Sequence, residues 1–79
     1  MRYAYLGFYT LTEAQRAKEL LELRSIGSRV VRMPSGPGIS CAFGLKLQES
    51  DAGEARRLLE GLGVTVGKTV YRRESGRKP

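Results

Sequence analysis

The sequence predicts a small α+β domain of ferredoxin-like topology, with a four-stranded antiparallel sheet and two helices on one face. Length is the first observation, because 79 residues are enough for one domain and not for two. Hydrophobic periodicity is the second, since it gives strand-like and helical segments in the order β-α-β-β-α-β. The two halves have the same order of elements. In the ferredoxin-like arrangement they form one sheet with the first and third strands in the centre.

The first half of the chain is expected to form a strand, a helix and a second strand. Residues 3–9 are aromatic and apolar, which favours a strand. Thr10 and Glu13 have the spacing of a capping box, so a helix should begin directly after Thr10. Gly27 supplies the left-handed conformation that ends many helices, and residues 28–33, with two adjacent valines, follow as the second strand.

The second half repeats this order after a loop that interrupts regular structure. The loop is Pro-Ser-Gly-Pro-Gly at residues 34–38, and the alternating segment 41–48 follows it as the third strand. Ser50 is the expected N-cap of the second helix, which ends at two glycines before a fourth strand over residues 64–71. We therefore expect one domain over residues 1–72 and a disordered basic tail over residues 73–79.

Composition narrows the range of functions. The chain has no histidine, which removes the commonest general base and most zinc sites, so we expect neither an enzyme active site nor a bound metal or cofactor. A single cysteine is typical of a reducing compartment rather than of a disulfide-bonded secreted domain. No apolar segment is long enough to cross a membrane, and the cytoplasm is the expected location.

Positive charge is concentrated at the end of the chain. The formal net charge is +6, and the last eight residues contain four basic residues against one acidic residue. Such a tail is either a solvated end or a contact for nucleic acid or an acidic partner. A chain this short has a marginal core, so formation of a homodimer is a further expectation.

Cys41 is the candidate reactive residue. In ferredoxin-like topology the third strand starts at the same end of the sheet as the first helix, so Cys41 should lie near Thr10 and Thr12. A helix N-terminus presents unpaired N–H groups and a partial positive charge, which favour a thiolate. A thiol in this place is suited to act as a nucleophile or persulfide carrier. The neighbouring segments add further candidates for the binding loop: Arg32, Gly36, Gly38, Ile39, Ser40 and Gly44.

A purely structural cysteine is the alternative interpretation. Strand alternation places Cys41 on the same side as Phe43, Leu45 and Leu47, which should face the helices. Free cysteine is among the residue types most often buried, and a flexible hairpin connection equally explains the glycines of the loop. The two interpretations predict different exposure of the sulfur.

Three tyrosines are expected on the outer face of the sheet, which points away from the helices. Tyr3, Tyr5 and Tyr9 alternate with apolar residues that should face the helices, and Lys46 should lie beside them. Outward aromatic residues on central strands are typical of a dimer or partner surface, and also of sheets that bind RNA by base stacking. The third strand lacks the aromatic-rich pattern of RNA-recognition sheets, which favours a protein partner or a second copy.

An ordered set of short motifs runs through most of the chain. It comprises Phe8-Tyr9-Thr10 with Glu13-Ala14, Lys18-Glu19-Leu20-Leu21, Val30-Val31-Arg32-Met33-Pro34, Ile39-Ser40, a cysteine, Gly44-Leu45-Lys46-Leu47 and the apolar helix of residues 55–62. In this set the chain resembles the selenium/sulfur carrier-like family of small bacterial domains. The resemblance implies a protein that holds sulfur or selenium on a cysteine thiol and exchanges it with a donor or acceptor protein.

The position of the cysteine departs from the family pattern. The resemblance implies a cysteine directly before Gly44, where this chain has Phe43, and Cys41 lies two residues earlier. A shift of two residues keeps the same face of a strand, so Cys41 is expected to serve in its place. The alternative is that this chain lacks the carrier thiol and is a non-catalytic dimerising module that binds protein or RNA. A third interpretation, a small-ligand sensor, rests on fold analogy alone.

Overall fold

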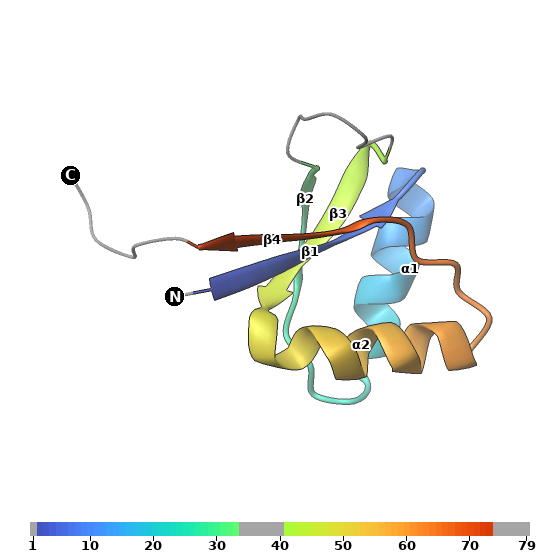
Figure 1. Cartoon of the computed structure of the whole chain (residues 1–79). Helices are drawn as coiled ribbons and strands as arrows, with labels where there is room; N and C mark the ends of the chain where they lie inside the picture. Colours follow the sequence, from blue (N-terminus) through green and yellow to red (C-terminus); the bar gives the residue numbers. More distant parts are fainter. Residues whose placement is uncertain (1, 34–40, 74–79) are drawn as a thin grey trace.

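The computed structural model describes residues 2–33 and 41–73, and its elements follow the expected order. The four strands are β1 (Arg2–Phe8), β2 (Arg29–Arg32), β3 (Phe43–Gln48) and β4 (Thr69–Arg73), and the two helices are α1 (Leu11–Glu22) and α2 (Glu49–Gly61) (Figure 1). Neighbouring strands are antiparallel in the order β2-β3-β1-β4, so β1 and β3 are central, as predicted. The fold is therefore the expected ferredoxin-like α+β arrangement.

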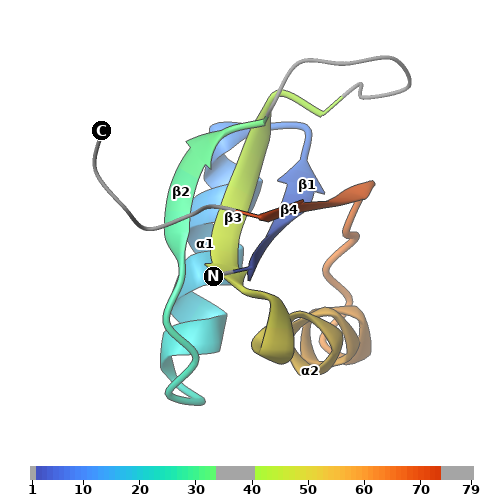
Figure 2. The same ribbon diagram turned by 60° about the vertical axis from the view of Figure 1, so that its left-hand side comes forward.

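Both helices cover the same face of the sheet (Figure 2). Alternation along β1 and β3 sends every second side chain into the core beneath the helices. The largest fully buried side chains are Leu6, Phe8, Leu21, Leu45 and Leu59. Because this core lies on one side only, the opposite face of the sheet carries residues that the main core does not use. We call it the outer face.

Helix α1 begins where the sequence predicts, and the left-handed residue that follows it lies two positions before the predicted one. The Thr10 hydroxyl accepts the N–H of Glu13, and the Glu13 carboxylate accepts the N–H of Thr10, both at 3.2 Å. The left-handed residue after the helix is Ser25, with φ at 62°, and not Gly27. The prediction for Gly27 is wrong because the chain reverses direction sooner, and the Ile26 N–H then donates to the Leu21 carbonyl at 3.0 Å.

Helix α2 follows β3 without a connecting loop. Gln48 is its N-cap and makes no side-chain capping bond, so the prediction of Ser50 is wrong. The two glycines at the other end behave as expected, since α2 ends at Gly61 and Gly63 has φ at 83°. In the described part of the chain, neither helix has the length and apolar character that a membrane span requires.

Gly53, on the exposed side of α2, gives a direct test of the helix. A β-carbon at this position would meet no heavy atom within 4 Å outside the backbone of its own helix. We expect Gly53→Ala to raise the free energy of unfolding by about 1 kcal/mol, because alanine loses less backbone entropy in a helix. Urea denaturation of both proteins measures this change, and a destabilised variant would show that α2 is wrongly assigned here.

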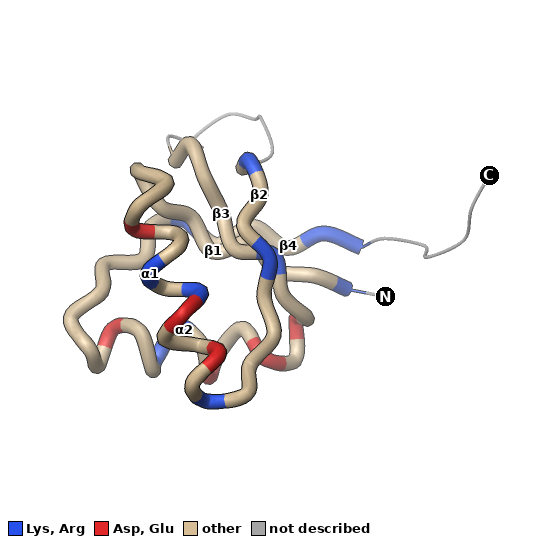
Figure 3. Tube along the Cα trace, turned by 180° about the vertical axis from the view of Figure 1, so that it is seen from behind, with Lys and Arg blue, Asp and Glu red and all other residues tan. Residues whose placement is uncertain are grey.

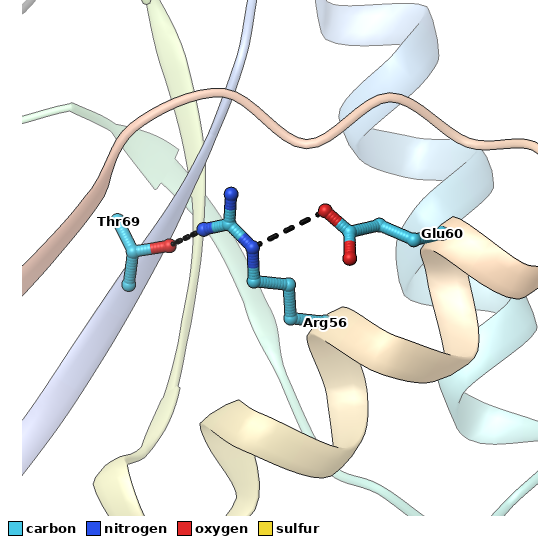
Figure 4. Close-up of polar contacts among 3 residues, drawn as sticks. All are labelled: Arg56, Glu60 and Thr69. Carbon is cyan, nitrogen blue, oxygen red and sulfur yellow. Dashed lines mark hydrogen bonds and ion pairs between the residues drawn. The ribbon is translucent and has the colours of Figure 1, made fainter.

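The connection from α2 to β4 is longer than predicted, because β4 begins only at Thr69. Arg56 of α2 reaches across to this point: its Nη1 donates to the Thr69 hydroxyl, and its Nε lies 3.3 Å from Glu60 (Figure 4). Arg56 thereby fixes the start of β4 against the helix layer. The strand ends at Arg73, one residue past the predicted end of the domain, and residues 74–79 of the expected tail lie outside the described chain.

Candidate functional site

Cys41 lies on the outer face of the sheet, opposite to the helices. It forms a small cluster with buried Tyr5 and Met33, against which three partly buried side chains pack: Tyr3, Val31 and Val70. The expectation that Cys41 faces the helices together with Phe43 is wrong. The chain bends at Ala42 and β3 starts at Phe43, so strand alternation does not extend back to the cysteine. Phe43 itself packs against the core beneath the helices.

The sulfur rests on two glycines, Gly7 and Gly67. We call this pair the glycine seat. A β-carbon at Gly67 would lie 2.5 Å from Cys41 Sγ, and one at Gly7 would lie 2.8 Å from it. The Gly67 N–H donates to the Gly7 carbonyl at 2.8 Å, and the Gly7 N–H donates to the Lys68 carbonyl at 3.1 Å. Backbone hydrogen bonds therefore hold the seat in place.

The sulfur is covered but belongs to the outer face. Cys41 is 6% exposed, against 0% for the innermost residues of the main core. It is the single cysteine of the sequence and forms no disulfide. Among the described residues, glycine backbone and the small cluster with Tyr5 and Met33 lie against it. This position differs from both predicted ones, since the sulfur is neither open to solvent nor enclosed by the leucines beneath the helices.

The N-terminus of α1 is occupied by its own side chains. The capping box uses the Thr10 hydroxyl for the N–H of Glu13, and it brings the Glu13 carboxylate to the positive end of the helix. Thr12 is exposed in the first turn. The structure therefore gives this helix end a carboxylate of its own, and Cys41 contacts the glycine seat, Tyr5 and Met33.

The other candidates of the binding loop divide into described and undescribed residues. Gly36, Gly38, Ile39 and Ser40 lie outside the described residues. Gly44 is buried on the outer face, paired with Gly7 across the central strands, and a β-carbon there would lie 2.5 Å from Met33 Sδ. Arg32 is exposed at the end of β2. Met33 and Cys41, on either side of the undescribed segment, thus both rest on glycines of the outer face.

The tyrosine surface is smaller than the sequence predicts. Tyr3 and Tyr5 lie on the outer face, as expected, but Tyr5 is only 9% exposed, so the prediction of an exposed Tyr5 is wrong. Its ring is covered because the side chains that rest on the outer-face glycines surround it. Lys46 Nζ lies 4.4 Å from the centroid of the Tyr3 ring, a cation–π contact. Tyr9 is exposed beyond the end of β1, and Tyr71 is exposed on the helix side of the sheet, where it pairs with Ala4.

The glycine seat was missed by sequence reasoning, although a signal for it exists. Glycine inside a strand pattern often marks a close approach of another part of the chain to the backbone. Gly7 interrupts the aromatic and apolar run of β1, and Gly67 lies just before β4. Within residues 2–33 and 41–73, no group of three or more Cys, Asp or Glu side chains is placed to hold a metal ion.

The comparison with protein families gives a match over most of the chain. A family model described as "Putative Se/S carrier protein-like" matches residues 3–71, a span that includes Cys41 and both residues of the glycine seat. No curated protein and no solved structure matches the chain.

Proposed function

Since the chain belongs to the Se/S carrier-like family, we propose that it holds sulfur or selenium on the Cys41 thiol and passes it to a partner protein. One observation supports Cys41 as the carrier atom: the only thiol of the chain lies on the outer face, at 6% exposure, and rests on two glycines.

The glycine seat suits a sulfur that must exchange with an incoming group. Because Gly7 and Gly67 bring no side chains, the side of the sulfur that rests on the seat is bounded by backbone. Steric hindrance near a thiol slows exchange, since the attacking and leaving sulfur atoms need a nearly linear approach to the reacting atom. The remaining cover over Cys41 must open for this approach, and exchange is therefore expected to be slower than for an exposed thiol.

The proposed loading step is a persulfide exchange that needs no outside oxidant. The Cys41 thiolate attacks the terminal sulfur of a donor persulfide, R–S–SH. A new S–S bond forms on Cys41 Sγ while the S–S bond of the donor breaks, and the donor leaves as a thiol after it takes up the proton that Cys41 released. The product is Cys41–S–SH, and a donor with terminal selenium gives Cys41–S–SeH by the same exchange. Attack by an acceptor thiol reverses the step and frees Cys41.

This function is carriage and not catalysis. One molecule of the protein takes up one sulfur or selenium atom and returns to its starting state only after an acceptor removes it. The partners are accordingly a donor and an acceptor protein, and neither a resident metal nor an organic cofactor takes part.

Intact-protein mass spectrometry tests the loading step. The reduced protein is incubated with a small persulfide donor, freed of excess donor and weighed without reduction. We expect the wild-type protein to gain the mass of one sulfur atom and Cys41→Ala to gain none. A selenium-bearing donor in parallel reactions reports which element is accepted.

The control for this experiment is a small peptide thiol, which confirms that the donor is active. Circular dichroism and a urea titration confirm that Cys41→Ala is folded. Absence of the adduct on folded wild-type protein, with a loaded control peptide, would refute Cys41 as the carrier.

A further inference from the structure

Charge is divided between the two layers of the molecule. The seven acidic residues of the described chain all lie on the two helices, which also carry four basic residues. The four strands carry six Lys or Arg residues and no acidic residue. Figure 3 shows this division, with red confined to the helices and blue on both the helices and the strands. The sheet is therefore the positive layer of the molecule.

Three of the basic residues lie on the same face as Cys41. The register pairs Arg29 with Lys46 and Tyr3 with Arg72, and Tyr3 belongs to the outer-face cluster. Like charges directly opposite one another on neighbouring strands repel, so this face favours the approach of an anion. Within the described residues, Arg29 and Arg72 form no ion pair.

A hollow on this face adds a second, independent feature. It has a volume of about 270 Å³, and Ser28, Arg29, Lys46 and Tyr3 contribute to its lining. The Ser28 hydroxyl is buried and has no hydrogen-bond partner among the described residues. Buried polar groups are normally satisfied, and the two cations that line the hollow make it suited to a carboxylate from outside the molecule.

The same face is poorly suited to stacking of nucleic-acid bases. Tyr5 is 9% exposed, and Lys46 lies over the ring of Tyr3. Sheets that bind single-stranded RNA need open aromatic rings on the central strands. Half-buried Val31 and Val70 beside the basic residues give the mixture of apolar and charged groups that is typical of a protein interface.

We propose that the outer face is the docking surface for an acidic protein partner, which places its own sulfur atom over Cys41 and a carboxylate in the hollow beside Arg29. This inference rests on the proposed function for the identity of the exchanged group, and on charge complementarity for the choice of partner. A partner that delivers sulfur to Cys41 must cover the face on which that thiol lies. The positive charge of this face then selects an acidic surface and repels a basic one.

Binding of short peptides tests the docking surface without any sulfur chemistry. Three dye-labelled peptides of equal length share a central serine. In the acidic peptide Asp and Glu flank this serine, in the neutral peptide only Ser and Gly flank it, and in the basic peptide Lys and Arg flank it. We expect the acidic peptide to bind most tightly by fluorescence anisotropy. Its affinity should fall about fivefold in Arg29→Glu/Arg72→Glu, since exposed charges each contribute modestly, and should fall further with added salt.

A matched control variant distinguishes an effect of the outer face from an effect of the net charge. Arg16→Glu/Arg57→Glu changes the net charge by the same amount on exposed positions of the two helices, and it should leave the affinity within about twofold of wild type. Equal binding of the acidic and basic peptides, equal effects of the two variants, or no binding would each overturn the proposal. Tighter binding of a labelled oligouridylate that Arg29→Glu/Arg72→Glu abolishes would overturn it in favour of nucleic acid.

The result of the peptide-binding test is independent of the result of the persulfide-loading test. The serine peptides contain no thiol, so their binding does not depend on the chemistry of Cys41. Loading by a small persulfide donor, conversely, requires no acidic surface. A protein that loads sulfur but shows no preference for acidic peptides retains the proposed function and loses this inference.

Discussion

Gly67→Ala is expected to destabilise the protein by about 1–3 kcal/mol, the usual cost of forcing an extra methyl group into a filled site. The β-carbon would lie 2.5 Å from Cys41 Sγ, so the sulfur or the backbone of the β4 connection has to move. The φ of Gly67 lies outside the left-handed region, which leaves the clash with the sulfur as the cause. Urea denaturation of the variant and of wild type measures the change.

A second substitution identifies the sulfur as the obstacle. Apart from Cys41 Sγ, the nearest atoms to a β-carbon at position 67 lie at 3.3 Å and beyond, so Cys41→Ala removes the severe contact. We expect Cys41→Ala/Gly67→Ala to be about as stable as Cys41→Ala alone, and a double-mutant cycle then gives a coupling energy of about 1–3 kcal/mol. Additive effects would show that the sulfur does not rest on Gly67. Gly53→Ala is the control for glycine replacement in open space.

Gly7→Ala is expected to have a larger effect, on the order of 3 kcal/mol or more, that removal of the sulfur does not reverse. Its β-carbon would lie 2.8 Å from both Cys41 Sγ and the backbone oxygen of Lys68. That oxygen accepts the Gly7 N–H at 3.1 Å, so it cannot withdraw without breaking the contact between β1 and the segment that leads into β4.

Comparing Gly7→Ala with and without Cys41→Ala tests this prediction even if Gly7→Ala is weakly stable. Gly7→Ala and Cys41→Ala/Gly7→Ala are measured by urea denaturation at low temperature, where each has its best chance of being folded. Rescue of Gly7→Ala by Cys41→Ala, or stability of Gly7→Ala equal to wild type, would contradict the geometry of the glycine seat.

Local signals explain why most of the fold was predictable. The capping box of Thr10 and Glu13 closes within four residues, so the sequence alone specifies it. The order of apolar segments determines the topology, because the ferredoxin-like arrangement is the standard solution for two β-α-β halves. The start of α2 was predicted less well: β3 passes directly into the helix, and Ser50 therefore lies inside the first turn instead of at the cap.

The site was less predictable because it depends on contacts between distant segments. Strand alternation was extended back to Cys41, but the bend at Ala42 reverses the face on which the sulfur lies. Tyr5 is buried because Met33 and Cys41 pack against glycines that are distant in the sequence. No local sequence pattern predicts these contacts. The identity of Cys41 as the candidate thiol needed no structure, since it is the only cysteine in the chain.

The charge division of the molecule was visible only after the elements were placed. The net charge of +6 and the basic end of the chain indicate an acidic partner or nucleic acid in general terms. Register decides which basic residues share a face with the thiol, and it brings Arg29 and Lys46 opposite each other on neighbouring strands. The register therefore locates the expected binding of anions on the outer face of the sheet.

The transfer of radiolabelled sulfur tests the central claim most directly. The protein is loaded from a labelled persulfide, separated from the donor, and mixed with a small acceptor thiol under anaerobic conditions. We predict that label bound one-to-one to the wild-type protein moves to the acceptor, and that Cys41→Ala neither binds nor transfers it. Equal binding of label by folded Cys41→Ala, or label on wild type that no thiol removes, would contradict a carrier that works through this sulfur.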